Sequence, residues 1–227
     1  MTPSESRLTE RPWVRAALTA VVWAWLGLLV LLPLAAVFAY AFREGVGAVL
    51  RALADPDTRS AARLTLLTVS VAVPVNALCG IAAAWAVAKH RFPGRGMLST
   101  LIDLPFSVSP VIAGLVFVLL FGAHGYWGPW LAAHGVRVIF ALPGIVLASV
   151  FVTFPFVARE LIPLMQEQGT EEEEAAVSLG AGGWQVFRRV TLPNIRGGLL
   201  LGAIQCAARA MGEFGAVSVV SGHIRGM

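Results

Sequence analysis

The stretch that decides the fold is EAAVSLGAGGWQVFRRVTLP, residues 174–193, which lies between two long apolar segments in the most charged part of the chain. Four consecutive acids, Glu171 to Glu174, end at its first residue and suit the positive end of a helix dipole. Thr170 and Glu173 have the spacing of a capping box, so we expect their side chains to bond free amides of the first turn. The helix that begins here should end at Gly180, because glycine readily takes the left-handed conformation found at helix C-termini.

A second short helix is predicted to begin near Trp184. It should end by Pro193, because proline removes a backbone donor and clashes with the preceding turn. The pattern therefore predicts a helix, a glycine turn and a second helix, exposed to water between membrane spans. Ala175 and Ala176 leave one face nearly free of side chains, so another protein can approach the backbone closely there.

The composition indicates a membrane protein. Of the 227 residues, 57% are hydrophobic and only 13% are charged, whereas soluble domains carry about 25% charged residues. Five apolar stretches have spanning length or close to it, and the first four contain almost no charge. They are residues 16–42, 64–88, 97–121, 139–158 and 197–222. We predict an all-α, polytopic transmembrane helical bundle.

Two of these spans carry polar groups and prolines that call for specific structure. Asn76, near the middle of the second span, is expected to bond an adjacent helix, with a role in a substrate pathway as the alternative. In the third span, Ser107 and Ser109 stand beside Pro105 and Pro110. We therefore expect irregular backbone at this place, facing a polar cavity.

Basic residues set the predicted orientation. They are concentrated in the tail 1–15, the loop 89–96 and the loop 159–196, and an excess of basic residues marks the cytoplasmic side. The N-terminus and the loop that holds residues 174–193 are thus expected in the cytoplasm. The net charge of +4 comes from residues that flank apolar segments rather than from one basic face, so nucleic acid is not an expected partner.

The spacing of the central stretch resembles the cytoplasmic coupling loop of ABC-importer permeases, which docks into a groove on an ATPase subunit. The residues that fill the pattern are Glu174, Ala175, Ala176, Gly180, Val190, Leu192 and Pro193. Three longer segments, Leu101–Trp130, Phe151–Ala176 and Arg209–Gly226, look like the CysW-type permeases of sulfate/thiosulfate ABC transporters. The resemblance covers the chain from about Arg11 onward.

This resemblance implies a permease domain over residues 16–227, preceded by the tail 1–15, in the bacterial inner membrane. It implies a T-type sister permease, an ABC ATPase dimer and a periplasmic sulfate-binding protein as partners. It also implies a sixth span beyond the five in this sequence. The chain holds no G-x-x-x-x-G-K-[ST] phosphate loop. We therefore expect no enzymatic activity and no cofactor of its own, with ATP and magnesium on the partner ATPase.

Arg209 and Glu213 are the candidate functional groups within the membrane. At a spacing of four they share one helical face and can form an ion pair, and ionisable groups at such depth are functional by default. The pair either locks this subunit to the sister permease or lines the substrate pathway. Four hydroxyl groups could add donors for an oxyanion: Ser107, Ser109, Ser218 and Ser221. His124 and His134 are too far apart for one helical face, so no metal site is expected.

The residues leave the substrate and the transport class open. They indicate a small polar solute; sulfate comes from the resemblance, and molybdate is the nearest competitor. An ion-coupled secondary transporter would use buried carboxylates and an internal repeat, but the spans hold one deeply placed acid. An intramembrane hydrolase would need a nucleophile and a base within reach, and no histidine lies in the middle of a span.

Overall fold

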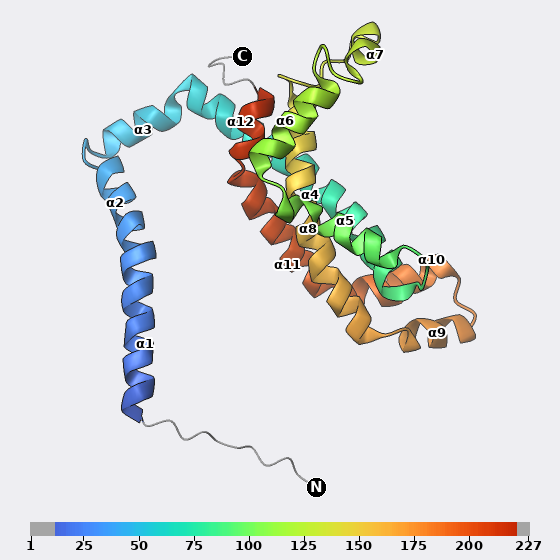
Figure 1. Cartoon of the computed structure of the whole chain (residues 1–227). Coiled ribbons are helices and arrows are strands. Elements are labelled where there is room, and N and C mark those ends of the chain that lie inside the picture. Colours follow the sequence, from blue (N-terminus) through green and yellow to red (C-terminus); the bar gives the residue numbers. More distant parts are fainter. Residues whose placement is uncertain (1–11, 222–227) are drawn as a thin grey trace. The chain divides into compact units, whose positions relative to one another are not determined.

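The computed structural model describes residues 12–221, and every regular element among them is a helix (Figure 1). This confirms the all-α prediction. The elements are α1 (Pro12–Leu26), the π-helix η1 (Gly27–Leu31), α2 (Leu32–Ala41), α3 (Val46–Ala54), α4 (Pro56–Lys89), α5 (Arg95–Ser107), α6 (Pro110–Phe121), α7 (Gly128–Ala133), α8 (Leu142–Gln168), α9 (Glu171–Ser178), α10 (Gly183–Val186), the π-helix η2 (Phe187–Thr191), α11 (Leu192–Met211) and α12 (Gly215–Ser221). Residues 1–11 of the predicted tail and the predicted end of the fifth span at Gly222 lie outside the described residues.

The chain divides into two compact units, before and after Arg59, and each is described by itself. In the first unit, α1, η1 and α2 form one continuous helical segment, Pro12–Ala41, which is long and apolar enough to cross a membrane. None of its residues is buried within the described part of the chain. The segment matches the predicted first span.

The core of the second unit is formed by α4, α8 and α11, with α8 in the middle. A Cβ added at Gly80 of α4 would lie 2.7 Å from Cγ1 of Val157 on α8. A Cβ added at Gly202 of α11 would lie 3.0 Å from the Cα of the same Val157. Small residues allow membrane helices to approach closely and to gain dispersion contacts. Leu161, Ile195 and their neighbours complete this buried cluster.

The third predicted span is a bent pair of helices. α5 and α6 meet at an angle of 106°, because Val108 and Ser109 adopt extended backbone before Pro110. This confirms the irregular backbone expected beside Ser107 and Ser109. Three helical segments of the described chain, Pro12–Ala41, α4 and α8, are long and apolar enough to span a membrane, and the number is four if the bent pair forms one span.

The fifth predicted span, residues 197–222, differs from the prediction of a single apolar helix. α11 begins earlier, at Leu192, and ends at Met211, and a new helix, α12, begins at Gly215. α11 is not among the segments of spanning character, because its first turns hold Asn194, Arg196 and two glycines. The break occurs where Glu213 binds the amide of Ala216 at 2.9 Å and so starts the new helix.

The two interrupted helices lie next to each other. Gly215 at the start of α12 lies against Pro110 and Val111 at the start of α6, so that an added Cβ would come within 3.1 Å of the Cβ of Pro110. Farther along, a Cβ at Gly114 of α6 would meet the carbonyl oxygen of Ala216 at 2.9 Å. α6 and α12 are neighbours in Figure 1. The polar breaks of both helices are thus brought to the same place in the bundle.

Candidate functional site

The central sequence stretch forms the pair α9 and α10 and leads through η2 into α11 (Figure 1). Glu174, Ala175 and Ala176 lie in α9, while Val190 lies in η2. α8 continues to Gln168, so the connection is shorter than the predicted loop 159–196. Pro163 lies inside α8 without ending it, and the helix ends only at Gly169, which has a φ of 65°.

Gly180 ends α9 as predicted. It adopts a φ of 89°, in the left-handed region that favours glycine. Its amide donates to the carbonyl of Val177 at 2.8 Å, and the amide of Ala181 donates to the carbonyl of Ala176 at 3.0 Å. These two bonds form a Schellman motif, which fixes the direction in which the chain turns towards α10.

The predicted capping box is wrong. Thr170 precedes α9, but its hydroxyl donates to the carboxylate of Glu174 at 2.7 Å rather than capping a backbone amide. The side chain of Glu173 points elsewhere, to Lys89 and Thr191. Any of the four adjacent acids can accept a hydrogen bond from Thr170, and Thr170 bonds Glu174. Glu173, the acid at the capping-box spacing, forms an ion pair with Lys89 instead.

The predicted end of the second helix by Pro193 is also wrong. α10, η2 and α11 follow one another without a break, with Pro193 in the first turn of α11. In the π-turn the amide of Leu192 donates to the carbonyl of Phe187, five residues back. This wider turn separates the proline ring from the carbonyl that it would meet in an α-helix. The same arrangement occurs before Pro33, where Leu32 donates to Gly27.

An exposed apolar surface covers the α9–α10 pair. We call Val177, Leu179 and Trp184 the knob surface; Leu179 is 89% exposed and Trp184 is 72% exposed. Ala175 is also exposed. Beneath this surface, Trp184 stacks on Phe187 at 5.5 Å between ring centroids, and Phe187 stacks on Trp85 of α4 at 5.2 Å. The knob surface is therefore braced against the bundle and remains open to a partner.

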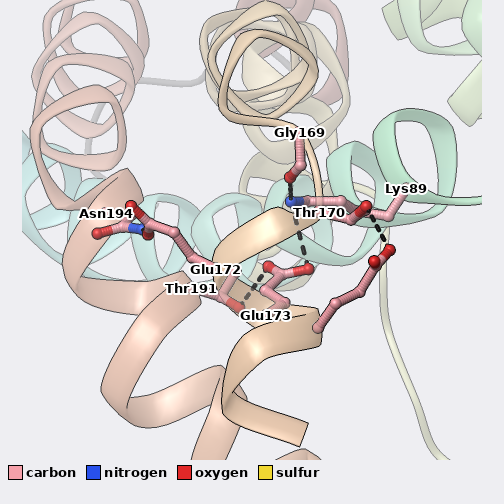
Figure 2. Close-up of polar contacts among 8 residues, drawn as sticks. Lys89, Gly169, Thr170, Glu172, Glu173, Thr191 and Asn194 are labelled. Carbon is pink, nitrogen blue, oxygen red and sulfur yellow. Dashed lines mark hydrogen bonds and ion pairs between the residues drawn. The ribbon is translucent and has the colours of Figure 1, made fainter. Parts of the chain in front are cut away.

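Buried polar contacts attach α9 to three helix ends (Figure 2). The ammonium of Lys89 forms an ion pair with Glu173 at 3.3 Å and donates to the carbonyl oxygen of Gly169. The other carboxylate oxygen of Glu173 accepts a hydrogen bond from Thr191 at 2.7 Å. The sequence indicated only that Lys89 belongs to a basic loop. The signal available in the sequence was that Lys89 directly follows the apolar run 64–88.

An open groove of about 710 Å³ includes Lys89 and Glu173 in its lining. Its lining combines α4, the α8–α9 connection, α9 and α10 through residues that include Trp85, His90, Thr170, Val177 and Val186. The groove thus has an aromatic and apolar wall and a charged rim. Within residues 12–221, no group of His, Cys, Asp and Glu side chains is placed to hold a metal ion.

Arg209 and Glu213 form the predicted ion pair, at 2.5 Å between Nη1 and Oε2. The side chain of Glu213 is 1% exposed, and its Oε1 accepts the amide of Ala216. The pair lies within one chain, across the gap between α11 and α12. Glu213 therefore has a structural task, the capping of α12, which sequence reasoning missed.

The four candidate serines are only partly brought together. Ser107 and Ser109 are exposed at the α5–α6 bend, next to the start of α12. Ser218 donates its hydroxyl to the carbonyl of Gly215 at 2.9 Å, so this group is used within α12. Ser221 lies at the other end of α12.

Comparisons with known proteins place this geometry in a family. Residues 76–223 match the model of the binding-protein-dependent transport system inner membrane component. The chain belongs to this family. The match begins within α4, extends to residue 223 and includes the whole α9–α10 pair.

Several curated relatives of this inner membrane component have similar sequences along most of their length. The sulfate transport system permease protein CysW of Escherichia coli (strain K12) is 55% identical over 198 residues, which is 87% of this chain and 68% of that protein. CysW of Synechocystis sp. is 51% identical over 213 residues, covering 94% of this chain and 77% of the relative. The sulfate transport system permease protein CysT of Escherichia coli (strain K12) is 38% identical over 197 residues, covering 87% and 71%. The chain is thus a multi-pass membrane component of a transport system.

Proposed function

We propose that this chain is a permease subunit of an ATP-driven importer for sulfate or thiosulfate in the bacterial inner membrane. The observation that carries the proposal is the knob surface: an apolar patch exposed on a helix pair that is bonded to the ends of the core helices. The names of the CysW and CysT relatives supply the substrate class. The chain has no phosphate loop, so hydrolysis of ATP is assigned to a partner ATPase dimer.

The remaining partners follow from the same proposal. A T-type sister permease would complete the translocation pathway, and a periplasmic sulfate-binding protein would deliver the solute. The N-terminus and the 159–196 region would face the cytoplasm, where the ATPase and its ATP and magnesium are found. The chain itself would hold no cofactor.

The proposed mechanism is rigid-body coupling between two states of a packed bundle. Closure of the ATPase dimer would displace α9 and α10. Because α9 follows α8 directly and α10 continues into α11, this displacement would tilt both helices and change the access to the pathway. Arg209 and Glu213, together with Ser107, Ser109, Ser218 and Ser221, are the proposed polar groups near that pathway.

The test is uptake by the complete complex in proteoliposomes. We expect sulfate uptake that requires ATP and the ATPase subunit and that persists when proton and sodium gradients are collapsed. Uptake without any ATPase, or driven by an ion gradient, would reject the proposal. Parallel assays with thiosulfate and molybdate, each with the binding protein, identify the preferred oxyanion.

A second measurement tests the knob surface. Leu179→Asp should lower retention of the ATPase on purified membrane subunits by roughly tenfold or more, the loss expected when a central apolar contact is replaced. Tyr126→Ala, which removes an exposed aromatic side chain from a different loop, should leave retention unchanged. Equal retention in both variants would argue against docking at α9 and α10.

A further inference from the structure

Lys89 is a cation with a mostly buried side chain at the edge of the groove, where three segments meet. It is the last residue of α4, and only 6% of its side chain is exposed. Its ammonium reaches the carbonyl oxygen of Gly169, which ends α8, and the carboxylate of Glu173 in the first turn of α9. A buried charge is stable only when paired and hydrogen-bonded, so these contacts hold the ends of α4 and α8 to α9.

Glu173 extends the connection to a fourth segment. Its side chain is 17% exposed, and one oxygen faces Lys89 while the other accepts the hydroxyl of Thr191. Thr191 is buried in η2, directly before α11. One carboxylate therefore ties the start of α9 to both α4 and the entry of α11, as Figure 2 shows.

The neighbouring acids do not contact Lys89, although Glu172 also reaches the first turn of α11. Glu172 is exposed and accepts a hydrogen bond from the side-chain amide of Asn194 at the surface. The side chain of Glu171, exposed at the first position of the same turn, makes neither a hydrogen bond nor an ion pair with the side chains of residues 12–221. The four acids of the run thus differ in their environment, and Glu173 alone among them contacts the buried lysine.

We infer that Lys89 and Glu173 are positioning residues that transmit displacement of α9 to α4 and α11. This role is separate from that of the knob surface, which docks the ATPase. The inference rests on the proposed function, since it assumes that an ATPase acts on α9. With the contacts intact, a movement of α9 must move the ends of α4, α8 and α11 together. Without them, α9 is connected through the chain and through surface bonds only, and it can move while the core helices stay in place.

The experiment measures the number of solute molecules moved per ATP hydrolysed by the complete complex. We expect sulfate uptake per ATP to fall by about fivefold or more in Lys89→Met and in Glu173→Gln. This factor is at the lower end of the effects that one site typically has on another. The double variant should be no worse than the poorer single variant, since both remove one contact. Lys89→Arg should retain most of the uptake per ATP, because it keeps the charge and the donors.

Glu171→Gln is the matched control. It removes the same charge from the same turn but no described contact, and uptake per ATP should stay at the wild-type value. Retention of the ATPase on the membrane subunits is measured in every variant and should be unchanged. This separates a loss of transmission from a loss of docking.

Two results would overturn the inference. One is unchanged uptake per ATP in both Lys89→Met and Glu173→Gln with the ATPase retained. The other is a loss of folded complex in these variants and also in Thr191→Val, which removes only the hydroxyl; the contacts would then serve folding rather than transmission. Failure of the proposed function is distinct, because it would abolish ATP-dependent sulfate uptake in the unmodified complex.

Discussion

Asn76 of α4 donates a hydrogen bond to Thr153 of α8 at 2.7 Å, and both side chains are completely buried. The hydroxyl of Thr153 in turn donates to the carbonyl of Ser149 at 2.6 Å. A buried polar pair between membrane helices is worth about 1 kcal/mol. The same amide also donates to Sγ of Cys206 on α11 at 3.4 Å. We expect Thr153→Val, which keeps the shape and removes the hydroxyl acceptor for Asn76, to lower the free energy of unfolding by about this amount.

Unfolding of the purified permease in mixed detergent measures this change. Ser70→Ala is the control, because the hydroxyl of Ser70 is exposed and bonds only the carbonyl of Leu66 in its own helix. A Thr153→Val variant as stable as Ser70→Ala would show that the interhelical bond contributes nothing.

The close approach of α11 to α8 gives a second prediction. Gly202→Val should lower the stability of the bundle by about 1–3 kcal/mol, the usual cost of overpacking a well-filled core. Gly197→Val introduces the same side chain into the same helix, where an added Cβ meets nothing within 4 Å. A thermal unfolding midpoint that is lower for Gly202→Val than for Gly197→Val confirms the prediction, and equal midpoints contradict it.

The turn after α9 gives a third prediction. The Cβ of a residue at position 180 would find open space, so the penalty of Gly180→Val arises from its φ of 89° alone. A left-handed β-branched residue costs about 1–3 kcal/mol. The knob surface would then lose its fixed direction, and we expect sulfate uptake to fall while the amount of protein in the membrane stays normal.

Gly180→Asn is the matched variant, because asparagine tolerates the left-handed region. It should retain most of the uptake. Normal uptake in Gly180→Val at normal membrane levels would count against a role of this turn in coupling.

The Arg209–Glu213 pair gives a fourth prediction, which separates the capping of α12 from a role in the pathway. Glu213→Ala removes the cap of α12 and the partner of Arg209, so it should destabilise the permease by about 1 kcal/mol or more. Glu213→Gln keeps an acceptor for the amide of Ala216 and should be more stable. If the pair only holds the helices, the KM for sulfate uptake by Glu213→Gln should equal that of the wild type.

A pathway role would instead change KM in Glu213→Gln without loss of folded protein. Ser218→Ala serves as the control for a general effect of the region, because the hydroxyl of Ser218 bonds within α12. A KM change of the same size in Ser218→Ala would remove the support for a specific role of Glu213.

The sequence predicted those features that depend on local chemistry or on burial alone. Apolar runs gave the first four spans closely, although α8 and α4 extend beyond the predicted ends. Gly180 was identifiable because few residues other than glycine end a helix in the left-handed conformation. The interhelical bond of Asn76 was predictable as a type of contact, because an amide in an apolar span needs a partner, but Thr153 was not predictable as that partner.

Other features depend on contacts between distant segments. The capping box failed because Glu173 binds Lys89, which lies far away in the sequence. The end of the helix at Pro193 failed because a π-turn accommodates the proline, and a single sequence has no clear signal for such a turn. The division of the fifth span depends on the way in which Glu213 binds the amide of Ala216 next to the bend of α5 and α6.

The cap on α12 has a consequence for any solute that reaches this level of the bundle. The amide of Ala216 is already occupied by a carboxylate of the chain itself, and Arg209 is already neutralised by the same group. A dianion arriving here would meet an ion pair without net charge in place of an unpaired cation. It would be held weakly, and short residence is what a conduit requires, because a solute that is held tightly is not released.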